Sequence, residues 1–278
     1  TVSRTPPPRV RTVLHLAANI DTARDADALR VNDVGTGHLL DWLAPVLRGA
    51  RVVYTSSVAA VDRQAPAKGP LTEASPCTPR TPYGLTKLRG EAIVKARAAD
   101  AGYTYTILRL ATIYGPGAKP GGLFDSLLTL TTTSRLLGRI NWPGRCSVMH
   151  VDDVARCLTA VGSVPEAVNE TYCTAAEAPT VSELAQRIAV AAGHPVDVVA
   201  LPPWIWSATR ALTWNPLVRA ACGAVAPTLF WRFSLLIDDG FWMDGARLNA
   251  LLEMAPVSLD AGLVSMLSKV ATVAQQLL

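Results

Sequence analysis

Three short apolar stretches rich in β-branched residues recur in the first 110 residues, and stretches with helical periodicity separate them. The apolar stretches cover 12–18, 51–57 and 105–110, and helical periodicity covers 29–47 and 87–99. Apolar runs of this length predict buried strands, and their alternation with helices predicts parallel βαβ units. The expected fold class is therefore α/β, with a parallel sheet.

Tyr83 and Lys87 lie four residues apart, just after Pro82 and at the start of the second helical stretch. In a helix this spacing places the phenol and the ammonium on one face, where a fixed positive charge stabilises phenolate. A hydroxyl with an ordinary pKa of ~10 can then exchange a proton closer to neutral pH. The alternative is a surface tyrosine beside a surface lysine, because the pattern Y-x-x-x-K arises easily by chance.

The ends of the predicted strands carry residues suited to a binding site. Ser56 and Ser57 end the stretch 51–57, and open α/β sheets bind ligands at the carboxyl ends of their strands. The stretch 12–18 ends in Ala17 and Ala18, whose small side chains allow close approach to the backbone. The candidate site is therefore expected at this edge of the sheet.

These segments, in this order, resemble the extended short-chain dehydrogenases and reductases, also called the NAD-dependent epimerase/dehydratase family. The matching segments are 13–18, 32–36, 53–57, Tyr83 with Lys87, 108–109 with 114–117, and 150–154, so that the resemblance covers residues 10–190. It implies a Rossmann-type sheet that binds NAD or NADP, followed by a mostly helical substrate lobe.

The resemblance also implies roles for individual residues. Tyr83 is the acid/base, Ser57 polarises the substrate oxygen, and Lys87 holds the nicotinamide ribose and lowers the pKa of Tyr83. Ser57 is preferred to Ser56 because it directly precedes the small-residue stretch 58–60. The implied catalytic residues are Ser57, Tyr83 and Lys87, and the implied cofactor-binding residues are Leu16, Ala17, Ala18, Tyr83, Lys87, Ala111 and Thr112.

The chain departs from the family pattern at its start. Its first glycine is Gly35, so residues 1–34 contain no glycine-rich turn to hold a pyrophosphate at a helix N-terminus. The missing part amounts to about 60 residues if each βαβ unit takes ~30. A shortened start, an N-terminal half outside the structure, and a natural remnant that no longer binds dinucleotide all stay open. We expect the 278-residue chain alone to be nearly inactive and to expose an edge strand near 12–16.

Two domains are predicted: a partial NAD(P)-binding domain at 1–175 and a substrate lobe at 176–278. Residues 118–150, although they lie within the first range, are expected to contribute to the substrate lobe. Five of the seven tryptophans lie between 201 and 242, in helical segments that prolines interrupt and arginines break. This stretch is either the core of the lobe, a pocket for a bulky apolar substrate, or an interfacial helix at a membrane surface. Its spacing loosely resembles the 3β-hydroxysteroid dehydrogenase branch.

The predicted function is hydride transfer between NAD(P) and a secondary alcohol or ketone of an apolar substrate. The alternatives are a sugar-nucleotide epimerase or dehydratase and a non-catalytic relative of the family. A homodimer and a peripheral membrane contact are further expectations.

Composition argues against other classes of function. The formal net charge is only +4 and the arginines are scattered, so nucleic-acid binding is unsupported. The five cysteines form no C-x-x-C pair, which indicates reduced thiols and a cytoplasmic location. The Asp pair in His150-Val151-Asp152-Asp153 is expected to cap a helix and supply its first-turn acids, not to bind a metal.

Overall fold

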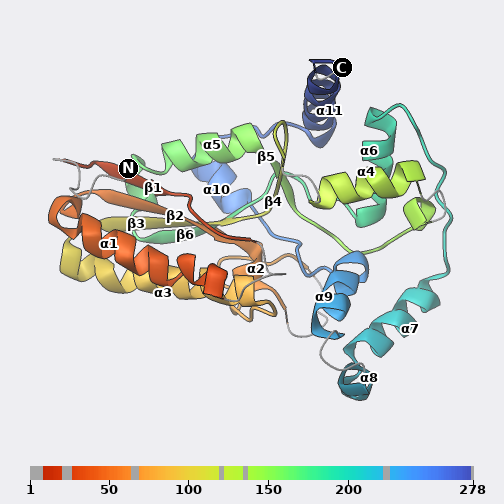
Figure 1. The fold of residues 1–278 in the computed structure, drawn as a ribbon, viewed down its shortest axis with the longest axis horizontal. Coiled ribbons are helices and arrows are strands. Elements are labelled where there is room, and N and C mark those ends of the chain that lie inside the picture. Colours follow the sequence, from red (N-terminus) through yellow and green to blue (C-terminus); the bar gives the residue numbers. More distant parts are fainter. Residues whose placement is uncertain are drawn as a thin grey trace.

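The computed structural model describes residues 9–20, 27–63, 69–118, 122–133, 137–221 and 226–276. Its main feature is a parallel sheet with the strand order β1-β2-β3-β6 (Figure 1). The four strands are β1 (Thr12–His15), β2 (Arg51–Ser57), β3 (Thr104–Leu110) and β6 (Glu170–Thr174). The predicted α/β class and the parallel arrangement are thus confirmed. The proline run 6–8, Pro120 and Gly121 lie outside the described residues.

The register of the sheet brings the strand ends together. Ser57 pairs with Leu110 of β3, and Leu110 pairs with Thr174 of β6. β1 pairs with β2 and, among the described residues, forms one edge of the sheet, with Leu14 40% exposed. The residues that follow β1, β2 and β3 therefore meet at a single carboxyl edge.

Helices cover both faces of this sheet, because each face is apolar. On one face lie α1 (Val34–Leu47) and α3 (Pro82–Ala101), and on the other lie α5 (Val151–Ala160) and α10 (Ala246–Leu251) (Figure 1). Two apolar clusters fill the layers between helices and sheet. The first contains Leu40, Leu43, Leu47, Val52, Tyr54, Val94 and Ile107, and the second contains Val53, Leu108, Val154, Cys157, Leu158 and Leu248.

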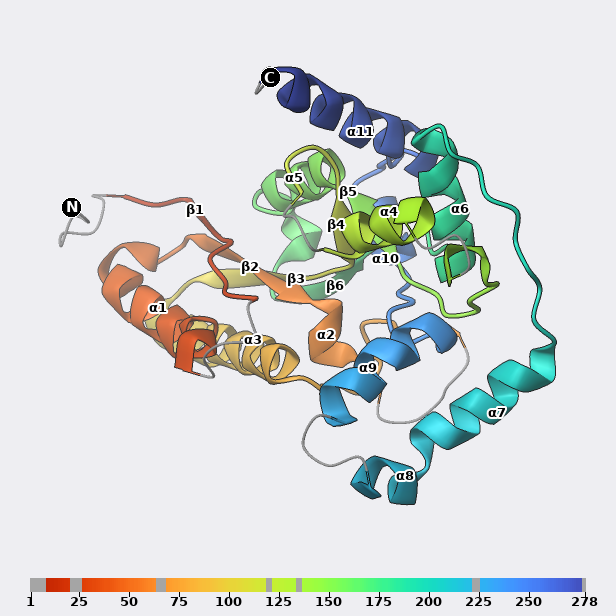
Figure 2. The same ribbon diagram turned by 45° about the vertical axis from the view of Figure 1, so that its right-hand side comes forward.

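The remaining elements lie beyond the carboxyl edge. A short parallel pair, β4 (Thr112–Tyr114) and β5 (Val148–His150), leads to α4 (Leu123–Thr133), α6 (Val181–Ala191) and α11 (Leu259–Gln276), which share a third apolar cluster. Farther out lie α7 (Pro203–Trp214), α8 (Pro216–Ala221) and α9 (Ala226–Ile237) (Figure 2). The division at residue 175 stays a prediction; α10, from the later part, packs on the sheet.

Short elements complete the connections between the layers. The helix α2 (Val58–Val61) follows β2 directly, and the 3-10 turns are η1 (Asp27–Val31), η2 (Leu137–Arg139) and η3 (Pro165–Ala167).

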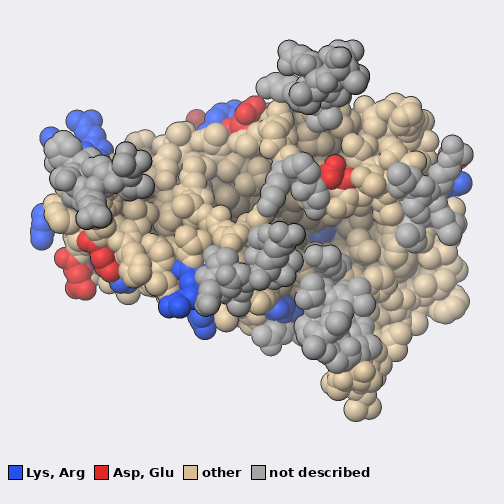
Figure 3. All heavy atoms as spheres, in the orientation of Figure 1, with Lys and Arg blue, Asp and Glu red and all other residues tan. Residues whose placement is uncertain are grey.

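On the face drawn in Figure 3, charged side chains gather over α1, α3 and α5, whereas no side chain coloured as charged lies over α7 and α8.

Two predicted boundaries differ from the structure. The strand predicted over 12–18 ends at His15, because the pairing with β2 stops there and the following segment is held by Asn32, which accepts the Asn19 amide. The helix predicted over 29–47 is broken at Asp33, whose carboxylate accepts a hydrogen bond from the Val34 amide at 2.7 Å and starts α1 anew.

Two glycines let α3 lie unusually close to its neighbours. A Cβ on Gly84 would overlap the carbonyl of Ala59 in α2, and a Cβ on Gly90 would overlap the Tyr54 hydroxyl in β2. The helix can therefore occupy this position only with glycine at both places. The same helix carries Tyr83 and Lys87, so this contact fixes their height above the sheet.

We expect Gly90→Ala to lower the free energy of unfolding by about 1–3 kcal/mol, because the added methyl group forces α3 away from Tyr54. Gly37→Ala is the matched control. Its methyl group would meet only the end of the flexible Arg97 side chain at 3.2 Å, and alanine favours a helix by up to about 1 kcal/mol over glycine. Chemical denaturation of both variants measures the difference, and equal stability of the two would contradict the close contact.

Candidate active site

Ser57 and its neighbour Ser56 have different surroundings. Ser56 is 2% exposed and donates a hydrogen bond to Oε1 of Glu91 at 2.6 Å. Ser57 is half-buried at the end of β2, where its Oγ accepts a hydrogen bond from the Ala59 amide at 3.2 Å and begins α2. The Ser56 hydroxyl is thus bonded to Glu91 within the core, and Ser57 is the serine that reaches the carboxyl edge.

Tyr83 lies in the first turn of α3, at the same edge. Thr81 caps this helix by accepting the Gly84 amide at 3.0 Å, and Pro82 occupies its first position. Burial raises the pKa of the Tyr83 phenol, and a hydrogen bond with the Ser57 side chain acts in the opposite direction. The structure thus brings Tyr83 and Ser57 together; their catalytic roles stay predictions.

Lys87 lies one helical turn beyond Tyr83 and is 1% exposed. Its ammonium lies 4.6 Å from the centre of the Tyr54 ring, a distance at which the ring face attracts a cation. Burial lowers the pKa of Lys87 to about 8, while the nearby Glu91 carboxylate opposes this shift. Lys87 therefore faces Tyr54, Glu91 and the core from within α3.

One electrostatic expectation is not met. The sequence predicts that Lys87 lowers the pKa of Tyr83, yet the pKa of Tyr83 is raised. The physical reason is desolvation: burial penalises the phenolate more than the hydrogen bond with Ser57 stabilises it.

Two buried residues at the site were not assigned from the sequence. His15 ends β1 with its Nε2 2.8 Å from Oγ1 of Thr36, and burial together with the charge of Lys87 lowers the pKa of His15 to about 4. Asn32 holds the segment after β1, since it accepts the Asn19 amide at 2.7 Å and donates to the Asn19 carbonyl at 2.9 Å. Its Nδ2 also donates to Thr86 of α3 at 3.1 Å. The matching segment 32–36 was the only signal for Asn32.

The predicted cofactor-binding residues fall into two groups. Leu16, Ala17 and Ala18 follow β1 and are exposed, Leu16 at 53%. Ala111 is buried and donates its amide to the Thr174 carbonyl at 3.1 Å, and Oγ1 of Thr112 lies 3.1 Å from Sγ of Cys146. Both groups follow strands that end at the carboxyl edge, as Ser57 does.

These residues fit one half of a nicotinamide dinucleotide. The small exposed residues after β1, together with Tyr83 and Lys87, suit the nicotinamide and its ribose. The first α-helix after β1 in the described residues, α1, begins at the Asp33 carboxylate, which disfavours a phosphate there. Within the described part of the chain, no glycine-rich turn opens a helix for the pyrophosphate.

A polar junction joins the site to the outer helices. Asp62, which ends α2 and is 1% exposed, accepts hydrogen bonds from Nε and Nη2 of Arg80 at 3.0 and 2.8 Å and from the Trp231 indole at 3.1 Å. Arg80 also donates to Oγ of Ser234 at 3.1 Å. The segments that carry Ser57 and Tyr83 are thereby tied to α9. No sequence pattern marked Asp62 or Arg80.

The tryptophan-rich stretch is helical, as predicted. Trp206 is 8% exposed, and the centre of its ring lies 5.3 Å from that of Trp142. The ring centres of Trp231 and Phe241 lie 5.8 Å apart. Trp204, in contrast, is 68% exposed. The stretch thus contributes both to the core of the outer part and to its surface.

The segment 150–154 is structural in this fold. His150, and not an aspartate as expected, caps α5, while Asp152 and Asp153 supply its first-turn acids as predicted. Asp153 is buried, pairs with Arg156 and accepts the Val257 amide at 2.8 Å. Among the described residues, no three His, Cys, Asp or Glu side chains are placed to share a metal ion.

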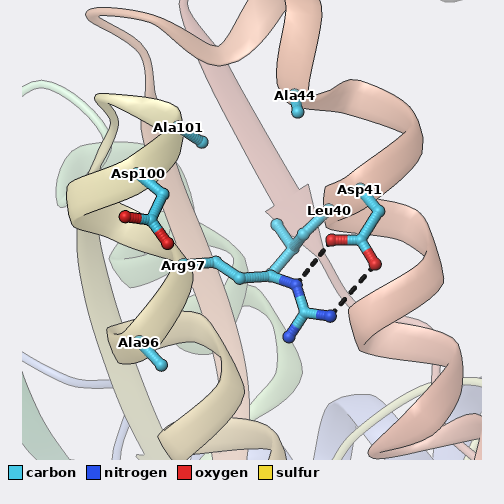
Figure 4. A pocket seen from close by; sticks show the side chains of 7 residues that line it. All are labelled: Leu40, Asp41, Ala44, Ala96, Arg97, Asp100 and Ala101. Atoms are coloured by element: carbon cyan, nitrogen blue, oxygen red, sulfur yellow. Dashed lines mark hydrogen bonds and ion pairs between the residues drawn. The ribbon is translucent and has the colours of Figure 1, made fainter.

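A depression between α1 and α3 is lined by small side chains and by the ion pair of Arg97 with Asp41 (Figure 4). Arg97 lies fourteen residues beyond Tyr83 along α3, a distance of roughly 21 Å at 1.5 Å per residue. This depression is therefore separate from the carboxyl edge and from the candidate site.

The family model for the NAD-dependent epimerase/dehydratase family matches residues 6–173, more than half of the chain. The chain belongs to this family. The predicted resemblance is thereby confirmed.

Relatives within the family differ in how much of each protein is matched. An uncharacterized UDP-glucose epimerase of Bacillus subtilis is 31% identical over 106 residues, which are 37% of this chain and 33% of that protein. Sterol demethylase protein B of Methylococcus capsulatus is 29% identical over 258 residues, 91% of this chain and 76% of the relative. The chain thus spans only about a third of the first of these curated relatives.

Solved structures of several NAD-bound proteins share the fold. The dTDP-glucose 4,6-dehydratase of Streptomyces venezuelae, solved with NAD bound, superposes with a TM-score of 0.68 at 21% identity, over 96% of this chain and 75% of that one. A structure of MoeE5 in complex with UDP-glucuronic acid and NAD gives a TM-score of 0.67 at 23% identity, over 94% and 79% of the two chains.

Across the described residues, none of the helices combines the length and apolar character that crossing a bilayer requires.

Lys87 should make stability depend on pH. Its folded pKa of about 8 is below the ordinary value of 10.5, so between these pH values the unfolded chain binds more protons and the folded state gains stability as pH rises. Below pH 8 the buried ammonium costs free energy. We expect Lys87→Met to be more stable than the parent there, by up to about 3 kcal/mol, with the gap narrowing toward pH 10.5.

Denaturation curves across this pH range measure the effect. Lys95→Met, at an exposed position on the same helix, is the control and should change stability by no more than about 0.5 kcal/mol. A Lys87→Met variant that is less stable than the parent below pH 8 would show that the contact with the Tyr54 ring outweighs the cost of burial.

Proposed function

We propose that this protein transfers a hydride between NAD(P) and a carbon that carries a secondary hydroxyl or a ketone oxygen. The observation that carries this proposal is that the side chains of Tyr83 and Ser57 lie close enough at the carboxyl edge for Ser57 to lower the pKa of the phenol, with Lys87 buried one turn beyond Tyr83. A phenol and a hydroxyl that converge in this way can hold one substrate oxygen between them. The family is NAD-dependent by its description, and membership supports the same cofactor here.

Each residue would act on a definite atom. Tyr83 would take the hydroxyl proton of an alcohol, or return it to a ketone oxygen, through its phenol oxygen. Ser57 would donate a hydrogen bond to the same oxygen, and Lys87 would bind the ribose hydroxyls. The cofactor, when bound, supplies or accepts the hydride. Burial raises the pKa of Tyr83 and so disfavours the phenolate form.

The proposed substrate is apolar. The helix α9 of the tryptophan-rich stretch supplies aromatic surface beside the segment that follows Ser57, where the Trp231 indole donates to Asp62. The extended match to sterol demethylase protein B, over 91% of this chain, supports the same substrate class.

A sugar nucleotide is the second candidate, and it also has a specific observation in its favour. Arg63, Arg145 and Arg210 all lie close enough to Asp239 to lower its pKa, although burial dominates and leaves that pKa raised. Such a group of guanidinium ions suits a diphosphate. Calorimetric titration with UDP-glucose and with a sterol-type alcohol distinguishes the two candidates, since tight binding of the nucleotide would exclude the apolar class.

The predicted cytoplasmic location and homodimer stay predictions.

In a full-length protein, Tyr83→Phe should lower turnover by about 10² or more, because general acid/base catalysis contributes roughly 10²–10⁴. Tyr105→Phe is the control. Tyr105 pairs with Val52 near the amino ends of β2 and β3, five residues from the level of Ser57, or roughly 17 Å at 3.3 Å per residue. The measurement is NAD(H) absorbance with the accepted substrate. Full activity in Tyr83→Phe would refute the assignment of this residue.

The 278-residue chain should bind NAD(H) several orders of magnitude more weakly than a typical family member. Its first glycine is Gly35, so the chain supplies no glycine turn for the pyrophosphate, and each lost hydrogen bond to a charged group is worth about 1.5–3 kcal/mol. Calorimetric titration of the chain with NADH measures this affinity. Micromolar binding would show that other residues of the chain form the phosphate site.

A further inference from the structure

The outer face of α7 and α8 is apolar and uncovered among the described residues. Trp204 and Leu212 of α7 are 68% and 58% exposed, and Leu217 of α8 is 77% exposed. Within α7, Ala208 and Ala211 lie between the two large side chains on the same stripe of the helix. Figures 1 and 2 both place the two helices at the periphery of the molecule.

The opposite side of α7 is held firmly in place. Trp206 packs against Trp142, and the Trp214 indole donates to Oδ2 of Asp238 at 2.8 Å. Arg210 pairs with Oδ1 of the same carboxylate at 2.5 Å. These contacts fix the rotation of the helix about its axis, so Trp204 and Leu212 cannot turn inward without breaking them.

The charge of this part of the chain favours one kind of surface. Residues 198–237 contain no aspartate or glutamate, and their three arginines are at 210, 219 and 232. Asp238 neutralises Arg210. The arginine at 219 belongs to α8 and that at 232 to α9, and both add positive charge to the segment. A negatively charged surface would therefore meet no carboxylate from these forty residues.

We propose that α7 and α8 form a docking surface for a bilayer that contains anionic phospholipids. Trp204, Leu212 and Leu217 would enter the region between headgroups and acyl chains, and the excess of arginine over carboxylate in residues 198–237 would favour an anionic surface. Tryptophan is enriched at this depth of a bilayer because its ring is amphipathic. A protein partner with an acidic face would satisfy the charge alone. The large exposed side chains of Trp204, Leu212 and Leu217, in a segment without carboxylates, fit lipid better.

The proposal is independent of the reaction assigned to Tyr83. The three apolar residues belong to α7 and α8, outside the elements that carry Ser57, Tyr83 and Lys87, and the surface would work whether the substrate is apolar or a sugar nucleotide. A failed activity assay therefore leaves the proposal intact, and a failed membrane assay leaves the proposed reaction intact.

Cosedimentation of the purified chain with vesicles tests it directly. The vesicles contain phosphatidylcholine alone or phosphatidylcholine mixed with phosphatidylglycerol. We expect the chain to bind the mixed vesicles, and to bind them more weakly at high salt. The double variant Trp204→Ser/Leu217→Ser should lower the partition coefficient about tenfold or more, because insertion of each side chain buries apolar area.

Val190→Ser is the matched control. Val190 is 64% exposed in α6, away from α7 and α8, and its substitution should leave vesicle binding unchanged. Trp204→Ser alone alters one exposed side chain, and an unchanged thermal unfolding midpoint shows that the fold is intact. Absence of binding to mixed vesicles, or equal binding by the parent and the double variant, would overturn the proposal. A dimer in solution that the double variant abolishes would also overturn it, because the surface would then bind a second copy of the chain.

Discussion

The buried ion pair between Glu91 and Arg109 is the contact on which the arrangement of the site depends. The two residues are 2% and 4% exposed, and Nε and Nη2 of Arg109 donate to the two carboxylate oxygens at 3.0 and 2.9 Å. Burial of two charges costs several kcal/mol each, so such a pair is tolerated only when its geometry and its other hydrogen bonds are satisfied. Here Ser56 and the carbonyl of Glu73 satisfy them. The pair therefore allows little freedom in how α3 lies on the sheet.

This constraint extends along α3 to the carboxyl edge. Tyr83, Lys87 and Glu91 follow one another at intervals of four residues and share a helix face. When Glu91 is locked to β3 through Arg109, and Gly90 is pressed against Tyr54, the positions of Lys87 and Tyr83 follow from helix geometry. A phenol at the height of Ser57 and an ammonium over an aromatic ring are both consequences of the same anchored helix.

A second constraint places the outer helices relative to that edge. Asp62 has a φ of 32°, a left-handed conformation that a residue with a side chain rarely adopts, and its carboxylate is buried against Arg80 and Trp231. The hydrogen bonds to this carboxylate offset the backbone strain. Because Asp62 follows the helix that begins at Ser57, and Arg80 precedes the helix that begins at Pro82, any movement of α9 acts on both segments of the candidate site.

The sequence by itself determined the parallel α/β fold, the serine at a strand end, and the helix that carries Tyr83 and Lys87 at one face. These features depend on periodicity and spacing within a few residues, which local physics fixes. Only the tertiary structure decided that Ser56 is occupied by Glu91, that burial raises the pKa of Tyr83, and that Asp62 joins Trp231, 169 residues away. It also decided which tryptophans are buried and which, like Trp204, face outward. Desolvation and long-range pairing depend on what packs against a side chain, and no local pattern in the chain records that.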